Sequence, residues 1–436
     1  MQQRDKRLAL HGGSPVRTKP WLDNLTIGEE ERRAACEVIA TGYLSLFEGV
    51  HAPDPPFSFW GGPYVQRLEQ AWADYYGARY AVSLNSATSG LMAAIGALGI
   101  GYGDEVIVSP YTMTASASCV LIYGAIPIFA DVQQQTGCLD PASIEARMTE
   151  RTKAIVVVHQ FGIPADMDPI MAVARERGMR VIEDCAQAHG AKHQGRFVGT
   201  IGDIGVFSLN ANKAIQTGEG AVCVTNDAQL RYRLALIRNH GEAVVEAASY
   251  EPITNIVGFN FRLTEIAAAM ALEQLKKLDR FTARRRDYVQ ALSEALSPYP
   301  FLLPPPRCSH AAWGADGCGT CLSTYYVYPM RFLSERCGLT RAEFTRLVRA
   351  EGIRLVEGYL RPLYLQPLYQ TKQAFKHGYP FTAPVNQAIR TNYERGACPM
   401  AEYLYEHEML INEHVRPPHT LEDVMDIARA IQKVVE

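Results

Sequence analysis

The stretch that decides the fold of this 436-residue chain is residues 207–220, FSLNANKAIQTGEG. An apolar run typical of a strand leads into a polar turn that carries one lysine, Lys213, and a glycine-rich segment follows. A lysine in a concave apolar site can have a lowered pKa and form an imine with a carbonyl compound. Ser208, just upstream, can reach a phosphate group in the same site. Because an isolated lysine is usually a solvated charge, this interpretation depends on the other motifs of the chain.

The second motif is residues 85–90, NSATSG, which stand before a helical stretch over residues 91–98. Small hydroxyl residues at the start of a helix predict an anion site, because free backbone N–H groups and the helix dipole favour negative charge there. The alternative is an ordinary Ser or Thr N-cap without a ligand.

The third motif is residues 181–190, VIEDCAQAHG, in which an apolar strand ends in an acidic pair. Ligands of open α/β sheets bind at this end of the strands. An aspartate at that position, Asp184, can pair with a protonated pyridine nitrogen and make the ring a stronger electron sink. The alternative is that Asp184 only caps a helix.

The pattern along the chain predicts an α/β protein. Between about residues 65 and 280, short apolar strands alternate with helical stretches, and their continuous apolar character favours a parallel sheet buried on both faces. The clearest of these strands are residues 105–108, 154–158, 180–183, 204–208 and 221–224. A helix over residues 263–296 leads to a C-terminal unit with a strand at 325–328 and helices at 341–350 and 421–435. We therefore expect an arm and loop over 1–64, a large domain over 65–280 and a small α+β domain over 281–436.

The first 60 residues are predicted to be irregular. Residues 52–63, APDPPFSFWGGP, are too rich in proline and glycine for a helix or a strand. The aromatic residues of this loop can cover a site or a subunit surface, or pack on their own domain.

The composition excludes several classes of protein. The formal net charge is −3 and charged residues make up 20%, so neither nucleic acid nor an anionic membrane is expected as a partner. We expect no signal peptide and no membrane span, and hence the cytoplasm. Cys119, Cys185 and Cys223 lie in apolar runs and are expected to be reduced and buried. The pair Cys318 and Cys321 has the spacing of half a zinc site, but a second tight ligand pair is missing, so incidental thiols in a loop are favoured.

Together the motifs resemble the sugar aminotransferases of the DegT–StrS family, which are fold-type I enzymes dependent on pyridoxal phosphate (PLP). The resemblance runs nearly end to end. It includes residues 8–17 (LALHGGSPVR), 101–107 (GYGDEVI), 184–190 (DCAQAHG), the lysine turn, 238–241 (RNHG) and 258–263 (GFNFRL). It implies a mostly parallel central sheet flanked by helices, with a smaller α+β C-terminal domain.

The resemblance also implies a role for each matching residue. It makes Lys213 the residue that holds PLP as a Schiff base, and Asp184 the partner of the pyridine nitrogen. Gln187 stands where a side chain bonds the phenolic oxygen of the ring. Ala87, Thr88 and Ser208 match the phosphate cradle. Asn260 matches an asparagine that reaches the phosphate of the other subunit, which implies a homodimer with shared active sites; the alternative is that Asn260 caps the next helix of its own chain.

Two positions depart from the family pattern. An aromatic residue usually stacks on the PLP ring after the Thr of a Pro-x-x-Thr segment, but here the segment is residues 109–113, SPYTM. Met113 falls at the stacking position, where a thioether can cover a ring face, and Tyr111 is the alternative. Ala221 replaces the last glycine of the usual Gly-Glu-Gly-Gly.

The predicted activity is transfer of an amino group from glutamate or glutamine to a keto-sugar or a cyclitol ketone. Residues 358–364 (GYLRPLY), 398–402 (CPMAE) and 413–414 (EH) resemble the branch that acts on cyclitol ketones in antibiotic pathways. A PLP-dependent sugar dehydratase is the runner-up, but that branch replaces the lysine with histidine. A PLP-binding regulator is the third hypothesis, and the intact lysine and aspartate count against it. A Rossmann dehydrogenase is set aside because residues 99–103, GIGYG, precede a strand instead of following one.

Overall fold

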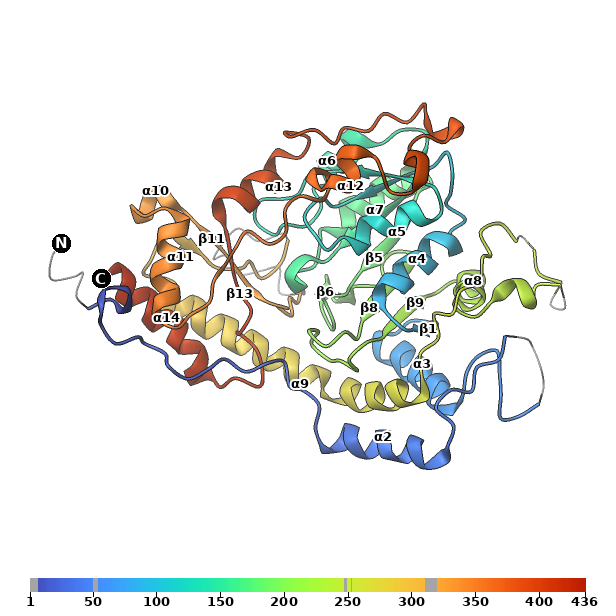
Figure 1. The fold of residues 1–436 in the computed structure, drawn as a ribbon, viewed down its shortest axis with the longest axis horizontal. Helices are drawn as coiled ribbons and strands as arrows, with labels where there is room; N and C mark the ends of the chain where they lie inside the picture. Colours follow the sequence, from blue (N-terminus) through green and yellow to red (C-terminus); the bar gives the residue numbers. More distant parts are fainter. Residues whose placement is uncertain (1–6, 50–53, 247–248, 252, 310–319) are drawn as a thin grey trace.

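The computed structural model describes residues 7–49, 54–246, 249–251, 253–309 and 320–436. The large domain is built on a seven-stranded sheet with the order β1-β9-β8-β5-β4-β2-β3 (Figure 1). Its strands are β1 (Tyr80–Leu84), β2 (Glu105–Val108), β3 (Ile126–Phe129), β4 (Thr152–Val158), β5 (Arg180–Asp184), β8 (Ile204–Ser208) and β9 (Ala221–Thr225). The pairs from β8 through β5, β4 and β2 to β3 are parallel, and β9 is antiparallel to both of its neighbours. The predicted mostly parallel sheet is confirmed.

Helices cover both faces of this sheet. Val206 packs in one core with α4, α5 and α8, whereas the next residue, Phe207, packs in another core with α3 and α9. Alternate side chains of a strand point to opposite faces, so both must be apolar, as the continuous apolar runs predict. The helices of the large domain are α3 (Pro63–Tyr76), α4 (Ala87–Ala97), α5 (Ala115–Ile122), α6 (Pro141–Arg147), α7 (Met167–Glu176) and α8 (Ala228–Arg238).

A single long helix, α9 (Glu265–Leu296), links the large domain to the small one. The small domain has an antiparallel sheet with the order β10-β11-β13-β12. Its elements are β10 (Leu302–Leu303), β11 (Tyr328–Phe332), β12 (Val356–Glu357), β13 (Met409–Asn412), α10 (Ser334–Cys337), α11 (Arg341–Ala350) and α14 (Leu421–Val435). The α+β character of this unit is as expected. The division predicted at residue 280 falls inside α9 and stays a prediction.

The strand predicted at residues 325–328 is wrong, because β11 begins only at Tyr328. Tyr325 has a φ of 51°, in the left-handed region, which breaks an extended strand. The buried Arg285 of α9 donates from Nη1 to the carbonyls of Tyr325 and Tyr326 at 3.2 and 2.9 Å. These carbonyls therefore bond a side chain instead of a neighbouring strand.

The prediction that the first 60 residues are irregular is also wrong in part, since α2 spans Glu29–Thr41. Its apolar side chains Ala34 and Val38 pack against Ala269 of α9. The buried Glu31 accepts hydrogen bonds from Gly28 N at 2.7 Å, from Gln274 Nε2 at 2.7 Å and from Lys277 Nζ at 2.8 Å. The helix is therefore docked by a buried carboxylate and by packing against a partner remote in sequence.

The chain between Tyr359 and Tyr403 returns from the small domain to the large one (Figure 1). This return segment carries α12 (Pro367–Thr371) and α13 (Pro399–Tyr403). Asn386 Nδ2 donates to Gly124 O at 2.8 Å, and the Tyr393 hydroxyl donates to Pro127 O in β3 at 2.7 Å. The segment thus covers the outer edge of the large sheet.

None of the helices in the described ranges is both long enough and apolar enough to cross a membrane.

Removing the Glu31 carboxylate should loosen α2. Glu31→Ala removes the acceptor of Gly28 N and one acceptor each of Gln274 Nε2 and Lys277 Nζ, so we expect a loss of about 1.5–3 kcal/mol in the free energy of unfolding. Glu29→Ala is the matched control: Glu29 lies in the same helical turn, is exposed and pairs with Arg32, so it should change stability little. Urea unfolding of both variants checks this, and equal effects would contradict the docking role of Glu31.

Candidate active site

The register of the sheet brings the predicted site residues to one edge, the edge formed by the carboxyl ends of the parallel strands. Leu84 at the end of β1 and Ser208 at the end of β8 both pair with Ala221 of β9. On the other side of β8, Asp184 at the end of β5 pairs with Val206. Because β9 is antiparallel to β1 and β8, the carboxyl ends of β1, β8 and β5 lie on the same edge, which is where open α/β sheets bind ligands.

The segment after β1, where the sequence predicts an anion site, begins helix α4. Ser86 is the N-cap of α4, and its hydroxyl accepts from Ser89 N at 3.1 Å. Within the described part of the chain, no hydrogen bond is made by the N–H groups of Ala87 and Thr88, the first two residues of the helix. Two free N–H groups, the helix dipole and the hydroxyl of the exposed Thr88 suit a phosphate group. Ser208, 4% exposed, lies on the same edge.

Asp184 presents a buried carboxylate at the centre of this edge. It is 5% exposed and accepts from Ser116 Oγ at 2.7 Å and from Ala186 N at 3.1 Å. Ser116 lies in the first turn of α5. A buried carboxylate with few donors suits a cationic N–H group as a further partner.

Lys213 lies in the turn after β8. Its backbone N–H bonds Asn210 O at 2.9 Å, and Ala211 N bonds Gly218 O at 2.9 Å, so the turn closes on the glycine-rich segment. The Lys213 side chain is half-buried, with Nζ 4.6 Å from the centre of the Tyr326 ring. Burial and the charge of Lys213 lower the pKa of the neighbouring His189 to about 3, so this imidazole is neutral at physiological pH.

Gln187 is buried and fixed at both ends of its amide. Its Oε1 accepts from Phe161 N at 2.8 Å, and its Nε2 donates to the Tyr359 hydroxyl at 3.0 Å. Tyr359 lies edge-on to Phe161 and Tyr111, with ring centres 5.2 and 6.0 Å away. Burial raises the pKa of Tyr359 well above its ordinary value, so the phenol stays protonated and can donate in turn.

The two candidates for covering a cofactor ring differ in exposure. Tyr111 is fully buried, while Met113 is 49% exposed. The buried Tyr111 is packed against Phe161 and Tyr359, so Met113 is the freer of the two to cover a ring.

Asn260 is exposed and lies near the predicted phosphate site of its own chain, because Phe261 O accepts from Asn85 N at 2.8 Å. The alternative that Asn260 caps the following helix is wrong, since Thr264 is the N-cap of α9 and accepts from Ala267 N. Within the described residues the Asn260 side chain has no hydrogen-bond partner, so it is available to a ligand or to another chain.

Sequence reasoning missed three residues of this edge. Ser116 and Tyr326 carry no motif of their own, and Tyr359 stood in the segment 358–364 without a role. Their positions come from α5, from the bend before β11 and from the start of the return segment. Only the fold brings these distant segments together.

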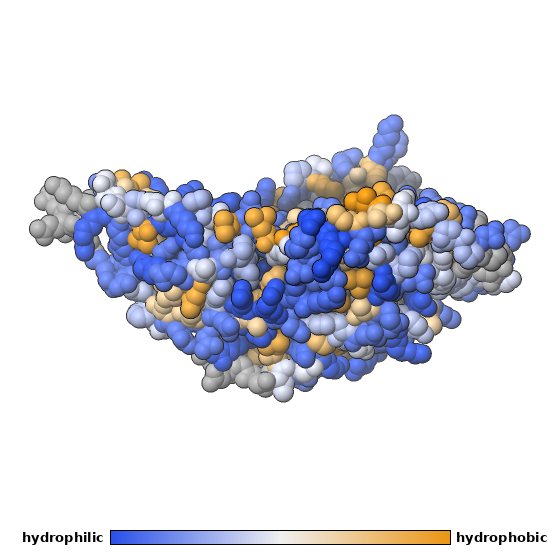
Figure 2. Space-filling model, turned by 90° about the horizontal axis from the view of Figure 1, so that it is seen from below, coloured by the Kyte–Doolittle hydropathy of each residue, from blue (hydrophilic) through white to orange (hydrophobic). Residues whose placement is uncertain are grey.

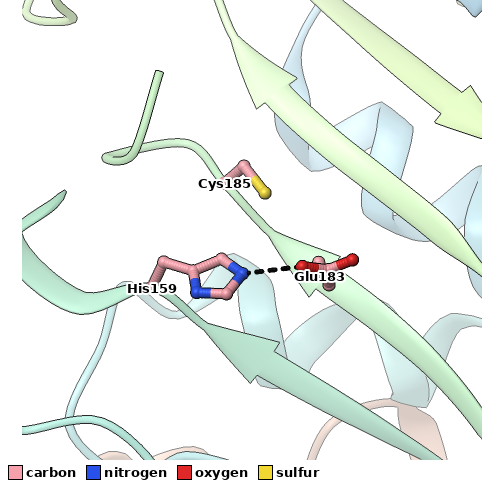
Figure 3. A group of neighbouring side chains, drawn as sticks. All are labelled: His159, Glu183 and Cys185. Carbon is pink, nitrogen blue, oxygen red and sulfur yellow. Dashed lines mark hydrogen bonds and ion pairs between the residues drawn. The ribbon is translucent and has the colours of Figure 1, made fainter. Parts of the chain in front are cut away.

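One cluster has residue types that could hold a metal: His159, Glu183 and Cys185 (Figure 3). Its ligand atoms are already engaged. His159 Nδ1 accepts from Ala165 N at 3.1 Å, so Nε2 carries the proton and donates to Glu183 at 3.0 Å. Burial raises the pKa of the Cys185 thiol well above its ordinary value, which disfavours the thiolate that metals bind.

The Glu183 carboxylate is instead a structural hub behind Asp184. It accepts from the N–H groups of Gly199 at 2.7 Å, Ile201 at 2.8 Å and Gly202 at 2.6 Å. The backbone N–H of His159 in turn bonds Asp184 O at 3.2 Å. The hub therefore fixes the strand end that presents Asp184. Of the pair Cys318 and Cys321, Cys318 lies outside the described residues, and Cys321 Sγ accepts from Gln194 N at 3.2 Å.

Comparison with known proteins identifies a family. The model of the DegT/DnrJ/EryC1/StrS aminotransferase family matches residues 57–432. The L-glutamine:2-deoxy-scyllo-inosose aminotransferase of Streptoalloteichus tenebrarius is 33% identical and covers 98% of this chain and 97% of its own length. The L-glutamine:scyllo-inosose aminotransferase of Streptomyces griseus is 33% identical over 99% of this chain and 98% of its own. The crystal structure of an aminotransferase from Psychrobacter cryohalolentis superposes with a TM-score of 0.79 at 30% identity, covering 95% and 98% of the two chains.

Glu183 should make stability depend on pH. Burial raises the pKa of Glu183, but the hydrogen bonds from His159, Gly199 and Gly202 lower it by more. The net pKa is therefore below the ordinary value. A carboxyl with a lowered folded pKa stabilises the protein above its unfolded pKa, and the stabilisation is lost as the pH falls through the folded pKa. We expect Glu183→Gln to lower the free energy of unfolding by about 2–4 kcal/mol at neutral pH, with the difference from wild type shrinking below about pH 4.

Urea unfolding at a series of pH values measures this difference. Glu176→Gln, which alters a carboxylate that is 75% exposed, is the control and should leave the pH profile unchanged. A deficit in Glu183→Gln that is equal at all pH values would contradict the charged state of the hub.

Proposed function

The chain belongs to the DegT/DnrJ/EryC1/StrS aminotransferase family, and we propose that it transfers the amino group of L-glutamine to a cyclitol ketone of the scyllo-inosose class. Support comes from the inosose aminotransferases that match the chain over nearly its whole length. Glutamate is the alternative amino donor, and a keto-sugar is the alternative acceptor. The observation that carries the reaction type is that β1, β5 and β8 end on the same side of the sheet. This places the start of α4, Asp184 and the turn of Lys213 at that side.

The residues at this edge fit PLP as the cofactor. The N–H groups of Ala87 and Thr88 and the hydroxyls of Thr88 and Ser208 would hold the phosphate. The buried Asp184 would meet the pyridine nitrogen, and one N–H of the Gln187 amide remains for the phenolic oxygen, because the other bonds Tyr359. Bound PLP supplies a carbonyl carbon that takes up the amino group and a ring that withdraws electrons from the substrate.

The protein groups then divide the work. Asp184, held by Ser116 and the N–H of Ala186, keeps a proton on the pyridine nitrogen. Lys213 would hold the cofactor through Nζ, and its amine, when free, would move a proton between the substrate carbon and the carbonyl carbon of the cofactor as a general acid and base. Tyr326, whose ring faces Nζ, shields this amine from water. Neutral His189 places no second cation beside Lys213.

We also propose that the enzyme acts as a homodimer with shared sites. The Asn239 side chain bonds the carbonyls of Glu48 and Phe59, and its backbone pairs with Asn260. This joins the loop after α2 to the loop that carries Asn260. Figure 2, seen from the side where α2 lies, shows hydrophobic groups among hydrophilic ones. Exposed apolar side chains lie in and beside α2 and in the loop that leads to Asn260; they are Leu25, Ile39, Tyr43, Leu44, Phe57, Ile253 and Val257. A second copy of the chain would cover them and receive Asn260 at its phosphate.

The free thiols of the described cysteines support the cytoplasm as the place of the reaction.

A half-reaction screen tests the proposed chemistry. The visible band of the PLP enzyme, at about 420 nm, should disappear with L-glutamine and return when a scyllo-inosose ketone is added. Recovery with a nucleotide-linked keto-sugar, and none with the cyclitol, would contradict the proposed acceptor. Lys213→Ala should lose all cofactor trapped by borohydride. Lys192→Ala is the matched control, because Lys192 also lies over an aromatic ring, that of Phe197 at 4.3 Å, and should trap cofactor normally.

Subunit mixing tests the shared site. Lys213→Ala and Asn260→Ala chains are each impaired alone, because one lacks the cofactor lysine and the other a donor to the phosphate. If Asn260 crosses the interface, their heterodimer combines both defects in one site and leaves the other intact. Random mixing should therefore restore about a quarter of the wild-type sites.

Mixing Lys213→Ala with Asp184→Asn is the control. Both residues serve their own subunit, so every site keeps one defect and no activity returns. If exchange is confirmed and the Asn260→Ala mixture behaves like this control, Asn260 serves its own subunit.

A further inference from the structure

The N-terminal arm, residues 17–28, passes from the small domain to the start of α2 and contacts the lysine turn on its way. Figure 1 shows this segment in dark blue, running from the neighbourhood of α14 toward α2. At the small domain, Arg17 Nη1 bonds Asp423 Oδ1 at 3.0 Å and Asp426 Oδ2 at 2.7 Å, both in α14. The Trp21 indole donates to Gly352 O at 3.0 Å. The arm is thus fixed to the small domain at its beginning.

Two histidines of the small domain complete this anchor. Leu22 N donates to His419 Nε2 at 3.1 Å, and the Trp21 ring stacks on His414 with centres 4.6 Å apart. Burial lowers the pKa of His414 to about 3 and lowers the pKa of His419 as well. Both rings are therefore neutral at physiological pH, and His419 keeps the free nitrogen that accepts from the arm.

The other end of the arm contacts the backbone of the lysine itself. Asn24 Nδ2 donates to Ala211 O and to Lys213 O, each at 2.8 Å. Asn24 is 7% exposed, whereas Ala211 is exposed. One buried amide thus bonds two carbonyls of this turn, one of the exposed Ala211 and one of the half-buried Lys213.

A second contact holds the far side of the same turn. Gln274 Oε1 of α9 accepts from Thr26 Oγ1 at 3.0 Å and from Gln216 N at 3.1 Å. Gln274 Nε2 returns a bond to Thr26 O at 3.0 Å. Asn24 therefore holds the turn at Lys213, and Thr26 holds it through Gln274 at Gln216.

We propose that Asn24 is a positioning residue for Lys213. We also propose that the arm couples the two domains, so that the placement of the small domain determines the placement of the lysine turn. The inference rests on the proposed role of Lys213 as the cofactor lysine. A lysine side chain is long and flexible, so the direction in which Nζ is presented depends on a fixed Cα, and Asn24 bonds the carbonyl attached to that Cα. The small domain thus contacts Lys213 at two points: Tyr326 faces Nζ, and the arm, which is anchored to the small domain, bonds the backbone carbonyl.

The test removes the two donors without changing the size of the side chain. Asn24→Asp turns the amide into a carboxylate that repels both carbonyls. Asn386→Asp is the matched control, since Asn386 is also buried and its Nδ2 also donates to two carbonyls, Gly124 O at 2.8 Å and Pro380 O at 2.9 Å. Arg17→Gln cuts the arm at its anchor, far from the lysine.

Two readouts are followed in the full chain. In the protein freed of cofactor, hydrogen exchange of residues 209–217 should speed up about tenfold or more in Asn24→Asp, less in Arg17→Gln, and not in Asn386→Asp. In the PLP-loaded enzyme, Asn24→Asp should shift the pH midpoint of the visible band and lower kcat about tenfold with KM for the amino donor little changed. Asn386→Asp should leave this midpoint at the wild-type value even where it destabilises the fold.

Equal exchange of residues 209–217 in Asn24→Asp and Asn386→Asp, or an unshifted midpoint in Asn24→Asp, would overturn the positioning role. If Asn24→Asp does not fold, Arg17→Gln decides, because wild-type exchange in that variant refutes transmission along the arm. Borohydride labelling of the wild-type enzyme separates this failure from that of the proposed function. Labelling elsewhere than Lys213 refutes the assignment of the lysine, while the exchange data still report on the arm.

Discussion

The buried carboxylate of Glu183 is the constraint on which the candidate site, at the carboxyl ends of the parallel strands, depends. A charge with no exposure must be matched by donors inside the protein, and here three backbone N–H groups and His159 supply them. Satisfying Glu183 therefore fixes the loop from Gly199 to Gly202 before β8 and the chain after β4. The backbone of Asp184, the next residue, is therefore fixed as well. Asp184, the proposed partner of the cofactor ring, is thus held in place by the neighbouring Glu183.

Much of this arrangement could be predicted from the sequence, because it is local. Strand β8, the turn at Lys213 and the glycines after it are consecutive, and so are β1 and the start of α4. Continuous apolar strands predict a buried parallel sheet, and the helix predicted over residues 263–296 agrees with α9 to within two residues at its start. These features depend on periodicity and turn chemistry, which short stretches of sequence contain.

The errors and omissions come from contacts between distant segments. Helix α2 is polar along most of its length and is stabilised by Gln274 and Lys277 of α9, about which its own residues say nothing. The aromatic run at 325–327 has the composition of a strand, but Arg285 takes two of its carbonyls. Asn24 stands in an arm without any motif, and its contact with Lys213 spans 189 positions. Tertiary hydrogen bonds of this kind override local propensity.

The return segment has a consequence for solubility. Strand β3 is at the edge of the large sheet, and an open edge is a template on which another chain can add a strand and start aggregation. Here Pro127 has no N–H to offer, its carbonyl is taken by the Tyr393 hydroxyl, and the carbonyl of Phe129 faces the thiol of Cys398. The same chain that links the small domain back to the large one therefore guards the sheet against self-association, and a copy shortened before this segment would expose an edge prone to form fibrils.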